Sequence, residues 1–194
     1  MFQPAPSNLI AAAPAPRSAA LLCFPGIRPE ELAAPFGILS ATADDVAGGA
    51  AFEIALIGPD PYPVRTASGT ALGTDHSIGD GAPDFDVLIV PCAFIRSEAF
   101  ARPAAIAALA ATIRRARRTG LFAASRHEAR RAKLLLRRAS SWATPAFWGA
   151  FRFERDPTRT EFVPDGRLLW AIGPEAAADL TARLISRFPR VVPY

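Results

Sequence analysis

Short apolar runs alternate along the chain with longer segments in which apolar residues recur every three to four positions. Four runs have the length of a strand and end close to glycine, proline or serine: 18–24 (SAALLCF), 51–58 (AFEIALIG), 86–91 (DVLIVP) and 120–123 (GLFA). The run at 86–91 is uncharged after Asp86 and rich in valine and isoleucine, which is typical of a central strand buried on both faces. The pattern therefore predicts a sheet with this run at its centre.

The segments between these runs carry helix signals. A helix is expected from Pro29, because proline suits the first helical position and acids such as Glu31 in the first turn suit the helix dipole. Residues 103–118 predict an alanine-rich helix with one apolar stripe. Ser125 and Glu128 have the spacing of a capping box, so a further helix is predicted to begin directly after the fourth strand.

Two hairpins and a last helix complete the pattern. Residues 63–72 predict a small strand-and-turn excursion, and the Pro-Asp-Gly turn within 161–172 predicts a second hairpin. The Gly-Pro-Glu triplet at 173–175 is expected to open the last helix. Alternating strands and helices predict an α/β domain whose largely parallel sheet is covered by helices on both faces. We expect one such domain over 19–194, preceded by a flexible Ala/Pro-rich tail over 1–18.

Composition limits the class and the compartment. The 194 residues are 51% hydrophobic and 21% charged, as in an ordinary globular domain, and no apolar run reaches the length of about 18 residues that a membrane span needs. The first eighteen residues lack the early positive charge and continuous apolar stretch of a secretory signal, so the cytoplasm is the default compartment. The two cysteines and two histidines stand apart and form no metal-ligand cluster. We expect no metal and no cofactor.

Basic residues are concentrated in one stretch. Ten of the 22 lysines and arginines lie between Arg114 and Arg138, where Glu128 is the only acid. Such a stretch suits nucleic acid or another anionic partner, and it also suits a solvated helix face. The solvated face is the favoured interpretation, because no recognisable DNA-binding module accompanies the charge. Specific nucleic-acid binding is therefore not expected, and no membrane partner is expected either.

Three strand ends are expected to lie together. In a parallel α/β sheet, ligands bind in the crevice at the carboxyl ends of the strands. The turns after Phe24, Val90 and Ala123 are expected at that edge. We therefore predict that the functional site is built from these three turns.

Five motifs follow one another along the chain: FPG at 24–26 with ELAAP at 31–35, DVLIVP at 86–91, an elbow stretch at 116–135, RASSW at 138–142, and DGRLL at 165–169 continuing to Leu180. In this order they resemble the ThiJ/PfpI (class I glutamine amidotransferase-like) superfamily, and in particular its branch of isocyanide-hydratase-like proteins and AraC-type regulators. The resemblance covers roughly residues 19–188. It implies a flavodoxin-like fold, with a parallel sheet sandwiched between helices and a small β-hairpin excursion, and it implies a homodimer.

The resemblance also implies that the nucleophile of this superfamily is missing. The cysteine of the family's strand-to-helix elbow falls on Ala123, the following residue is Ala124, and the elbow glycine is Ser125. Alanine offers no nucleophile, so cysteine-dependent catalysis of the family's kind is not expected.

Two further family positions differ in how far they are kept. The Gly-Gly pair whose amides form an oxyanion pocket in the family falls on Cys92 and Ala93. The acid that faces the family's cysteine is kept as Glu31. A carboxylate that satisfies the helix dipole explains Glu31 equally well.

The leading hypothesis is a degenerate family member that binds a small molecule in the former active-site crevice. The sequence does not identify the ligand. The crevice is expected to be lined by residues of the three turns and of the following helix start: Gly26, Ala93, Ala123, Ala124, Ser125 and Arg126.

Two alternatives stay open. The first is an enzyme, a repurposed lyase or hydratase that uses Glu31 with Cys92 or His127. Cys92 is expected on the rim of the crevice and to be alkylated more readily than Cys23, although a free cysteine after a strand is more often a packing residue. His127 suits a general base, or it points to solvent. The second alternative is a ligand-sensing regulatory domain without its own DNA-binding module, because the chain ends at Tyr194.

Overall fold

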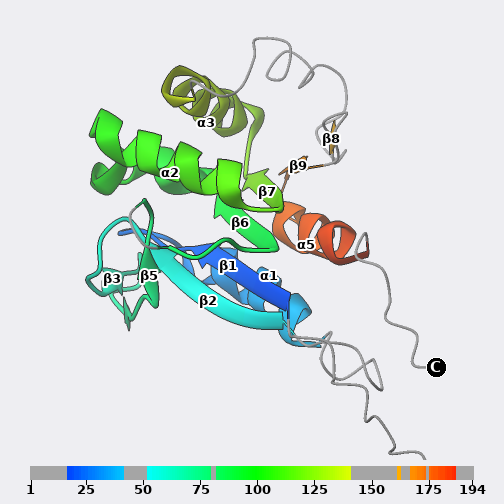
Figure 1. The fold of residues 1–194 in the computed structure, drawn as a ribbon. Coiled ribbons are helices and arrows are strands. Elements are labelled where there is room, and N and C mark those ends of the chain that lie inside the picture. The colour runs from blue at the N-terminus through cyan, green and yellow to red at the C-terminus, as the bar shows by residue number, and fades with distance from the viewer. Residues whose placement is uncertain are drawn as a thin grey trace, which may run out of the picture.

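One sheet of seven strands forms the centre of the structure, a computed structural model that describes residues 17–41, 52–79, 82–140, 161–162, 167–173 and 175–186. Across the sheet the order is β5 (His76–Ser77), β2 (Phe52–Gly58), β1 (Arg17–Leu22), β6 (Val87–Pro91), β7 (Arg118–Ala123), β9 (Leu168–Ile172) and β8 (Glu161–Phe162) (Figure 1). Neighbouring strands are parallel except β8 and β9, which are antiparallel. The largely parallel sheet with β6 at its centre is therefore confirmed.

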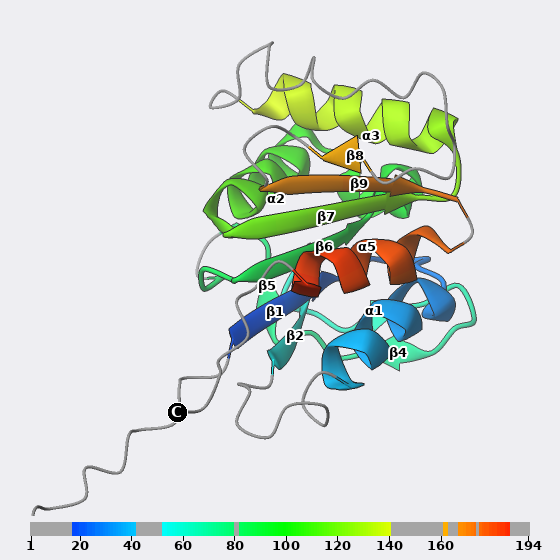
Figure 2. The same ribbon diagram turned by 90° about the vertical axis from the view of Figure 1, so that its right-hand side faces the viewer.

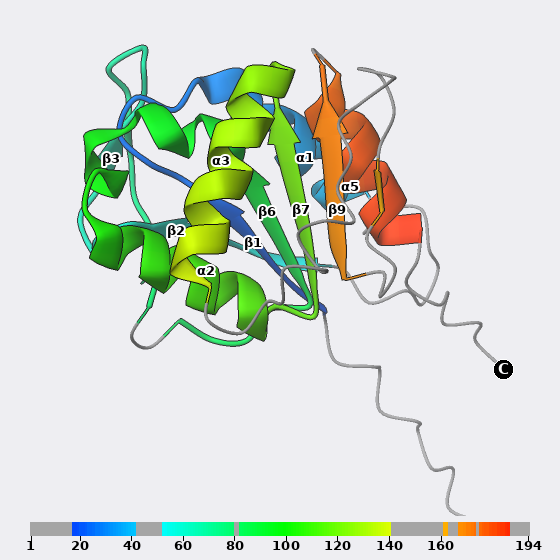
Figure 3. The same ribbon diagram turned by 90° about the horizontal axis from the view of Figure 1, so that it is seen from above.

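In the described part of the chain, four α-helices cover the sheet. The helices α1 (Pro29–Ala41) and α5 (Ala176–Ser186) pack together on one face, and α2 (Pro103–Arg115) and α3 (Arg126–Ala139) pack together on the other (Figures 2 and 3). Two short 3₁₀ helices, η1 (Cys92–Arg96) and η2 (Glu98–Phe100), lead from β6 to α2. None of the described helices is long and apolar enough to cross a membrane. This arrangement confirms the flavodoxin-like fold.

Both predicted hairpins are present, and some boundaries differ. The strands β3 (Val64–Arg65) and β4 (Ala71–Leu72) form the small excursion, and β8 pairs with β9 in the second hairpin, whose turn lies outside the described residues. β1 begins at Arg17, so it takes in the last two residues assigned to the tail, and the rest of the tail lies outside the described residues. α2 ends at Arg115 and not at 118, because Arg118 already begins β7.

The core lies where the central strands meet the helices. All five residues of β6 are buried, and Leu121 and Trp170 in the next two strands are buried as well. Gly120 in β7 lets α5 approach the sheet closely, since a Cβ atom at this position would overlap the side chains of Leu180 and Leu184. The central strands and α5 thereby fix one another's positions.

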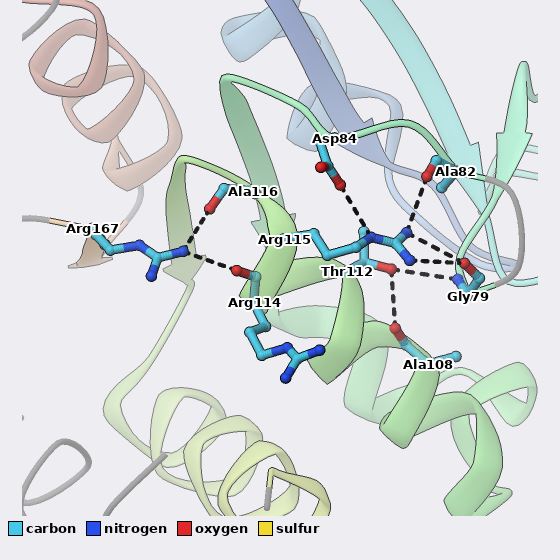
Figure 4. A network of polar contacts seen from close by, with 9 residues as sticks. All are labelled: Gly79, Ala82, Asp84, Ala108, Thr112, Arg114, Arg115, Ala116 and Arg167. Carbon is cyan, nitrogen blue, oxygen red and sulfur yellow. Dashed lines mark hydrogen bonds and ion pairs between the residues drawn. The ribbon is translucent and has the colours of Figure 1, made fainter. Parts of the chain in front are cut away.

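Arg115 ties the end of α2 to a loop at the amino-terminal edge of the sheet (Figure 4). Its guanidinium donates to the carbonyl of Gly79 at 3.3 Å and to the carbonyl of Ala82 at 3.1 Å. It also lies 3.4 Å from the carboxylate of Asp84. Arg115 belongs to the basic stretch, and these contacts give it a structural role.

Arg167 stabilises the same end of α2 from the start of β9 (Figure 4). Its Nη2 donates to the carbonyls of Arg114 at 2.8 Å and Ala116 at 3.2 Å. The last carbonyls of a helix have no partner within the helix, so a guanidinium beside them satisfies acceptors that water would otherwise bind.

The close approach of α5 to β7 gives a stability prediction. Gly120→Ala should lower the free energy of unfolding by about 2 kcal/mol, because the added methyl group forces the two leucines of α5 apart. Gly37→Ala is the matched control: no atom lies within 4 Å of its added Cβ, and alanine in a helix is favoured by about 0.5 kcal/mol. Urea unfolding measures both, and an unchanged midpoint for Gly120→Ala contradicts the packing described here.

Candidate functional site

Three helix starts meet at the carboxyl edge of the sheet. β1, β6 and β7 are neighbouring parallel strands, and they lead into α1, η1 and α3 respectively. The order β2-β1-β6-β7-β9 reverses between β1 and β6, and ligands bind at such a reversal in open α/β sheets. The predicted convergence of the three turns is confirmed.

Gly26 makes the turn between β1 and α1. Its φ of 84° lies in the left-handed region, which favours glycine. Its N–H donates to the carbonyl of Arg65 at 2.8 Å and so ties the turn to the β3–β4 hairpin. Phe24, two residues before it, packs edge-on against Phe100 with ring centroids 6.3 Å apart. The turn thereby brings Arg28 and the start of α1 to the edge of the sheet.

Glu31 caps the start of α1. It is the third residue of the helix, and its Oε2 accepts a hydrogen bond from the N–H of Arg28 at 3.1 Å. The Arg28 guanidinium donates to Oε1 at 3.0 Å, and this hydrogen bond, followed by the charge of Glu31, raises the pKa of Arg28. Only 7% of Glu31 is exposed. Its interpretation as a first-turn carboxylate is confirmed, and both of its oxygens are engaged within the protein.

Glu128 occupies the corresponding place at the start of α3. Ser125 is the N-cap, and its hydroxyl accepts from the N–H of Glu128 at 3.3 Å, as predicted. In a capping box the glutamate would accept a hydrogen bond from the N–H of the N-cap residue, Ser125. Here Oε2 of Glu128 accepts instead from the N–H of Ala124 at 2.7 Å, one residue before the N-cap. Its Oε1 lies 3.1 Å from Nη2 of Arg96 in η1. Two buried carboxylates, each paired with an arginine, therefore stand at this edge.

Cys92 lies at the end of β6, where it is fully buried. Burial raises the pKa of its thiol well above the ordinary value, and the charges of Glu128 and then Glu31 raise it further. Cys23 is buried too, and burial followed by the charge of Asp75 raises its pKa to about 12. The prediction of an accessible Cys92 on the rim of a crevice is wrong, because the first turn of η1 is itself part of the core. A buried, neutral thiol is a poor nucleophile.

The turn from β7 to α3 presents no reactive side chain. Ala123 is the last residue of β7 and is 1% exposed, and its carbonyl accepts from the N–H of Gly173 at 2.9 Å. Ala124 and Ser125 are exposed, whereas Ala93 is buried. No residue other than glycine has a positive φ in the described part of the chain, so this turn stores no left-handed strain.

Arg126 and His127 lie in the first turn of α3. His127 is exposed and Arg126 is half-buried. Among the described residues, no hydrogen bond or ion pair joins His127 to Glu31 or Cys92. No group of histidine, cysteine and acidic side chains in the same residues has an arrangement that could hold a metal ion. The first turn of α3 therefore supplies no general-base pair with the other two candidates.

A groove of about 780 Å³ opens beside these helix starts, between α1 and α5 and next to the end of β7. Of the candidates named from the sequence, Glu31 and Ala124 line it. Its other lining residues are small, apolar or acidic, apart from Arg28, and the polar set is Arg28, Glu30, Glu31, Glu175 and Asp179.

Sequence reasoning missed the two arginines of the site and the contribution of α5. Arg28 precedes the predicted helix start and has capping-box spacing to Glu31, so a signal for it was present. Arg96 meets Glu128 only because η1 folds back beside α3, and no local pattern announces such a contact. Glu175 and Asp179 line the groove because α5 packs against α1, which is also a tertiary effect.

Comparisons with known proteins agree with this architecture. A DJ-1 superfamily protein from Agrobacterium tumefaciens matches with a TM-score of 0.57 and 17% identity, over 89% of this chain and 92% of that chain. A ThiJ/PfpI family protein from Pseudomonas syringae matches with a TM-score of 0.55 and 18% identity, over 100% of this chain and 84% of that chain. An AraC family transcriptional regulator from Pseudomonas putida matches with a TM-score of 0.54 and 14% identity, over 89% of this chain and 91% of that chain. No family model and no curated protein matches the sequence. The resemblance to these proteins is confirmed as a shared fold.

The burial of both thiols predicts their reactivity. Neither Cys23 nor Cys92 should be alkylated during brief exposure to iodoacetamide at about pH 8, because both are covered and protonated in the folded protein. Both should react fully in denaturant, which serves as the control. Mass mapping of the labelled peptides makes the measurement, and rapid labelling of Cys92 in the folded protein contradicts its burial.

The same pKa shifts predict how stability depends on pH. The folded state keeps the Cys23 thiol neutral to about pH 12, whereas an ordinary thiol ionises near 9. The unfolded chain therefore loses protons first as the pH rises, so the contribution is complete below about pH 9 and is lost between about 9 and 12. The free energy of unfolding should fall more steeply over this range in the natural protein than in Cys23→Ala. Equal slopes in urea titrations contradict the shift.

Proposed function

We propose that this chain is a degenerate ThiJ/PfpI-like protein that binds a small molecule in the groove between α1 and α5 without forming a covalent bond to it. The observation that carries the proposal is the groove itself, about 780 Å³ in volume, at the carboxyl edge of the sheet. This volume lies within the range of about 300–1,000 Å³ that is usual for ligand sites. The adjoining turn offers Ala124, and both cysteines are buried.

The lining of the groove favours a ligand that carries a positive charge. Glu30, Glu31, Glu175 and Asp179 contribute carboxylates, against the single guanidinium of Arg28. Arg28 and Glu31 neutralise one another, and Asp179 pairs with Arg183 at 2.9 Å, so the attraction for a positive charge comes mainly from Glu30 and Glu175. Phe122, Ile38 and several alanines supply the apolar part of the lining. An amine with an apolar body matches both features, because the acids attract the nitrogen and the apolar floor contacts the carbon skeleton.

A repurposed lyase or hydratase is less well supported by the same geometry. Such an enzyme needs a free base or a thiolate at the reacting centre. Glu31 is held by Arg28 through both of its oxygens, and Cys92 is buried. His127 belongs to α3, which covers the face of the sheet opposite to α1 (Figure 3). Noncovalent binding needs neither a free base nor a thiolate, so it is compatible with this arrangement.

A ligand-sensing role is the second candidate. The observation that favours it is the shared fold with an AraC family transcriptional regulator, of which the matching region covers 91%. In that case the groove would hold the signal molecule, and binding would be read by another protein or domain. Both hypotheses require a ligand in the groove, so identifying that ligand is the first test of either.

The ligand class is testable with matched amines and carboxylic acids. Amines with short apolar bodies should raise the melting temperature and bind in calorimetry, and the corresponding acids should not. Glu175→Gln should weaken amine binding about five- to tenfold, because one charge-assisted hydrogen bond is lost. Ala178→Trp should abolish binding by filling the groove. Glu53→Gln is the control, because it changes an exposed acid at the amino-terminal end of β2, at the other edge of the sheet from the groove. Tighter binding of the acids would falsify the proposed ligand class.

The homodimer implied by the resemblance stays a prediction, and one surface supports it. α1 carries no charge after Glu31, and Phe36 on its outer side is 48% exposed. Exposed large apolar side chains on an uncharged helix face are typical of contact surfaces between subunits. Sedimentation equilibrium should give a dimer, and Phe36→Glu should give a folded monomer. A monomer at high concentration in the natural protein contradicts the prediction.

A further inference from the structure

The exposed face of α3 has an unusual composition. Ala129, Ala132 and Leu136 form its buried side, together with the carboxylate of Glu128. The outward side consists of Arg130, Arg131, Leu134, Arg137 and Arg138, all exposed, and is named here the α3 arginine face. Leu134 is 46% exposed, which makes it one of the large apolar side chains that the described fold leaves at its surface.

Helical spacing places the leucine at the centre of the arginines. Arg130 and Arg131 precede Leu134 by four and three residues, and Arg137 and Arg138 follow it by three and four. Residues three or four apart are neighbours on a helix surface. Four guanidinium groups therefore surround one exposed apolar side chain.

This face lacks the neutralising partners found elsewhere in the basic stretch. Arg115 and Arg117 lie within ion-pair distance of Asp84 and Asp86. Within the described residues, none of the four arginines of the α3 arginine face has a carboxylate within 4 Å. The single acid of α3, Glu128, is buried and paired with Arg96. The basic stretch therefore divides into structural arginines near α2 and an unneutralised set on α3.

We infer that the α3 arginine face is a docking surface for an acidic, amphipathic peptide segment of a partner protein. Guanidinium groups bind carboxylates through paired hydrogen bonds, so a segment with acids at helical spacing matches the arginines. Arg130 and Arg137 are seven residues apart, which is about 10 Å along the helix axis, so the complementary acids lie about two turns apart. An apolar residue between those acids covers Leu134.

The central leucine distinguishes this occupant from the other polyanions. Nonspecific binding to a nucleic-acid backbone is driven by neutralising phosphates and needs no exposed apolar residue among the arginines. A membrane-surface helix needs a continuous apolar face, and the outward side of α3 offers Leu134 alone. A short acidic segment with one apolar residue uses both features of the surface.

The test uses the full chain and a fluorescent, alanine-based helical peptide with one leucine flanked by glutamates three and four residues away on each side. At about 150 mM salt, anisotropy should show saturable one-to-one binding. Arg130→Gln with Arg137→Gln should weaken it at least tenfold. Arg114→Gln with Arg117→Gln, an equal loss of charge elsewhere in the basic stretch, should change it less than twofold. Leu134→Ser should weaken it at least threefold.

The peptide supplies a second measurement that does not depend on how a variant folds. Replacing its leucine with serine should weaken binding to the natural protein at least threefold. A 16-base-pair DNA duplex and vesicles containing phosphatidylserine are the competing ligands. The proposal is overturned if the peptide does not bind, or if its affinity is unchanged when Leu134 or the leucine of the peptide is replaced with serine. Tighter binding of the duplex or the vesicles to the same face overturns it as well.

Discussion

Two buried carboxylates at the carboxyl edge of the sheet are the constraint on which the site depends. The first amides of a helix have no partner within the helix, and Glu31 and Glu128 satisfy amides at the starts of α1 and α3. A carboxylate taken out of water must itself be paired, because the desolvation of an unpaired charge is strongly unfavourable. Arg28 and Arg96 provide that pairing from the protein surface. The helix starts, the arginines and the strand ends are thus held in one arrangement.

This arrangement also sets the chemistry available at the edge. The two carboxylates that cap the helices act on Cys92 in the same direction as burial, against ionisation of the thiol. An active thiol needs the reverse, a positive neighbourhood and access to solvent. A site with these charges favours noncovalent recognition, and the alanines at the turn after β7 support the same conclusion. Under the proposed function, the acids of α1 and α5 would be the recognition elements of the groove.

The fold could be predicted from the sequence further than the site could. The apolar run that follows Asp86 and the proline at the start of α1 are local signals, so β6 and α1 lie where the pattern placed them. The same holds for the Ser125 cap, although the return bond from Glu128 reaches Ala124. Burial of Cys92 depends on how η1 closes over the strand, and the pairing of Arg96 depends on where α3 lies. These are contacts between distant segments, and no local pattern encodes them.

The small net charge of +4 conceals a separation of charge between the two faces of the sheet. On the face covered by α1 and α5, four carboxylates and the single guanidinium of Arg28 line the groove (Figure 3). On the outward side of α3, four arginines have no carboxylate partner among the described residues. The sheet and its core lie between them, so the groove carries an excess of negative charge and the outward side of α3 an excess of positive charge. An amine and an acidic segment would therefore be drawn to different faces of the molecule. One compact sheet can in this way support two recognition surfaces that do not compete for the same ligand.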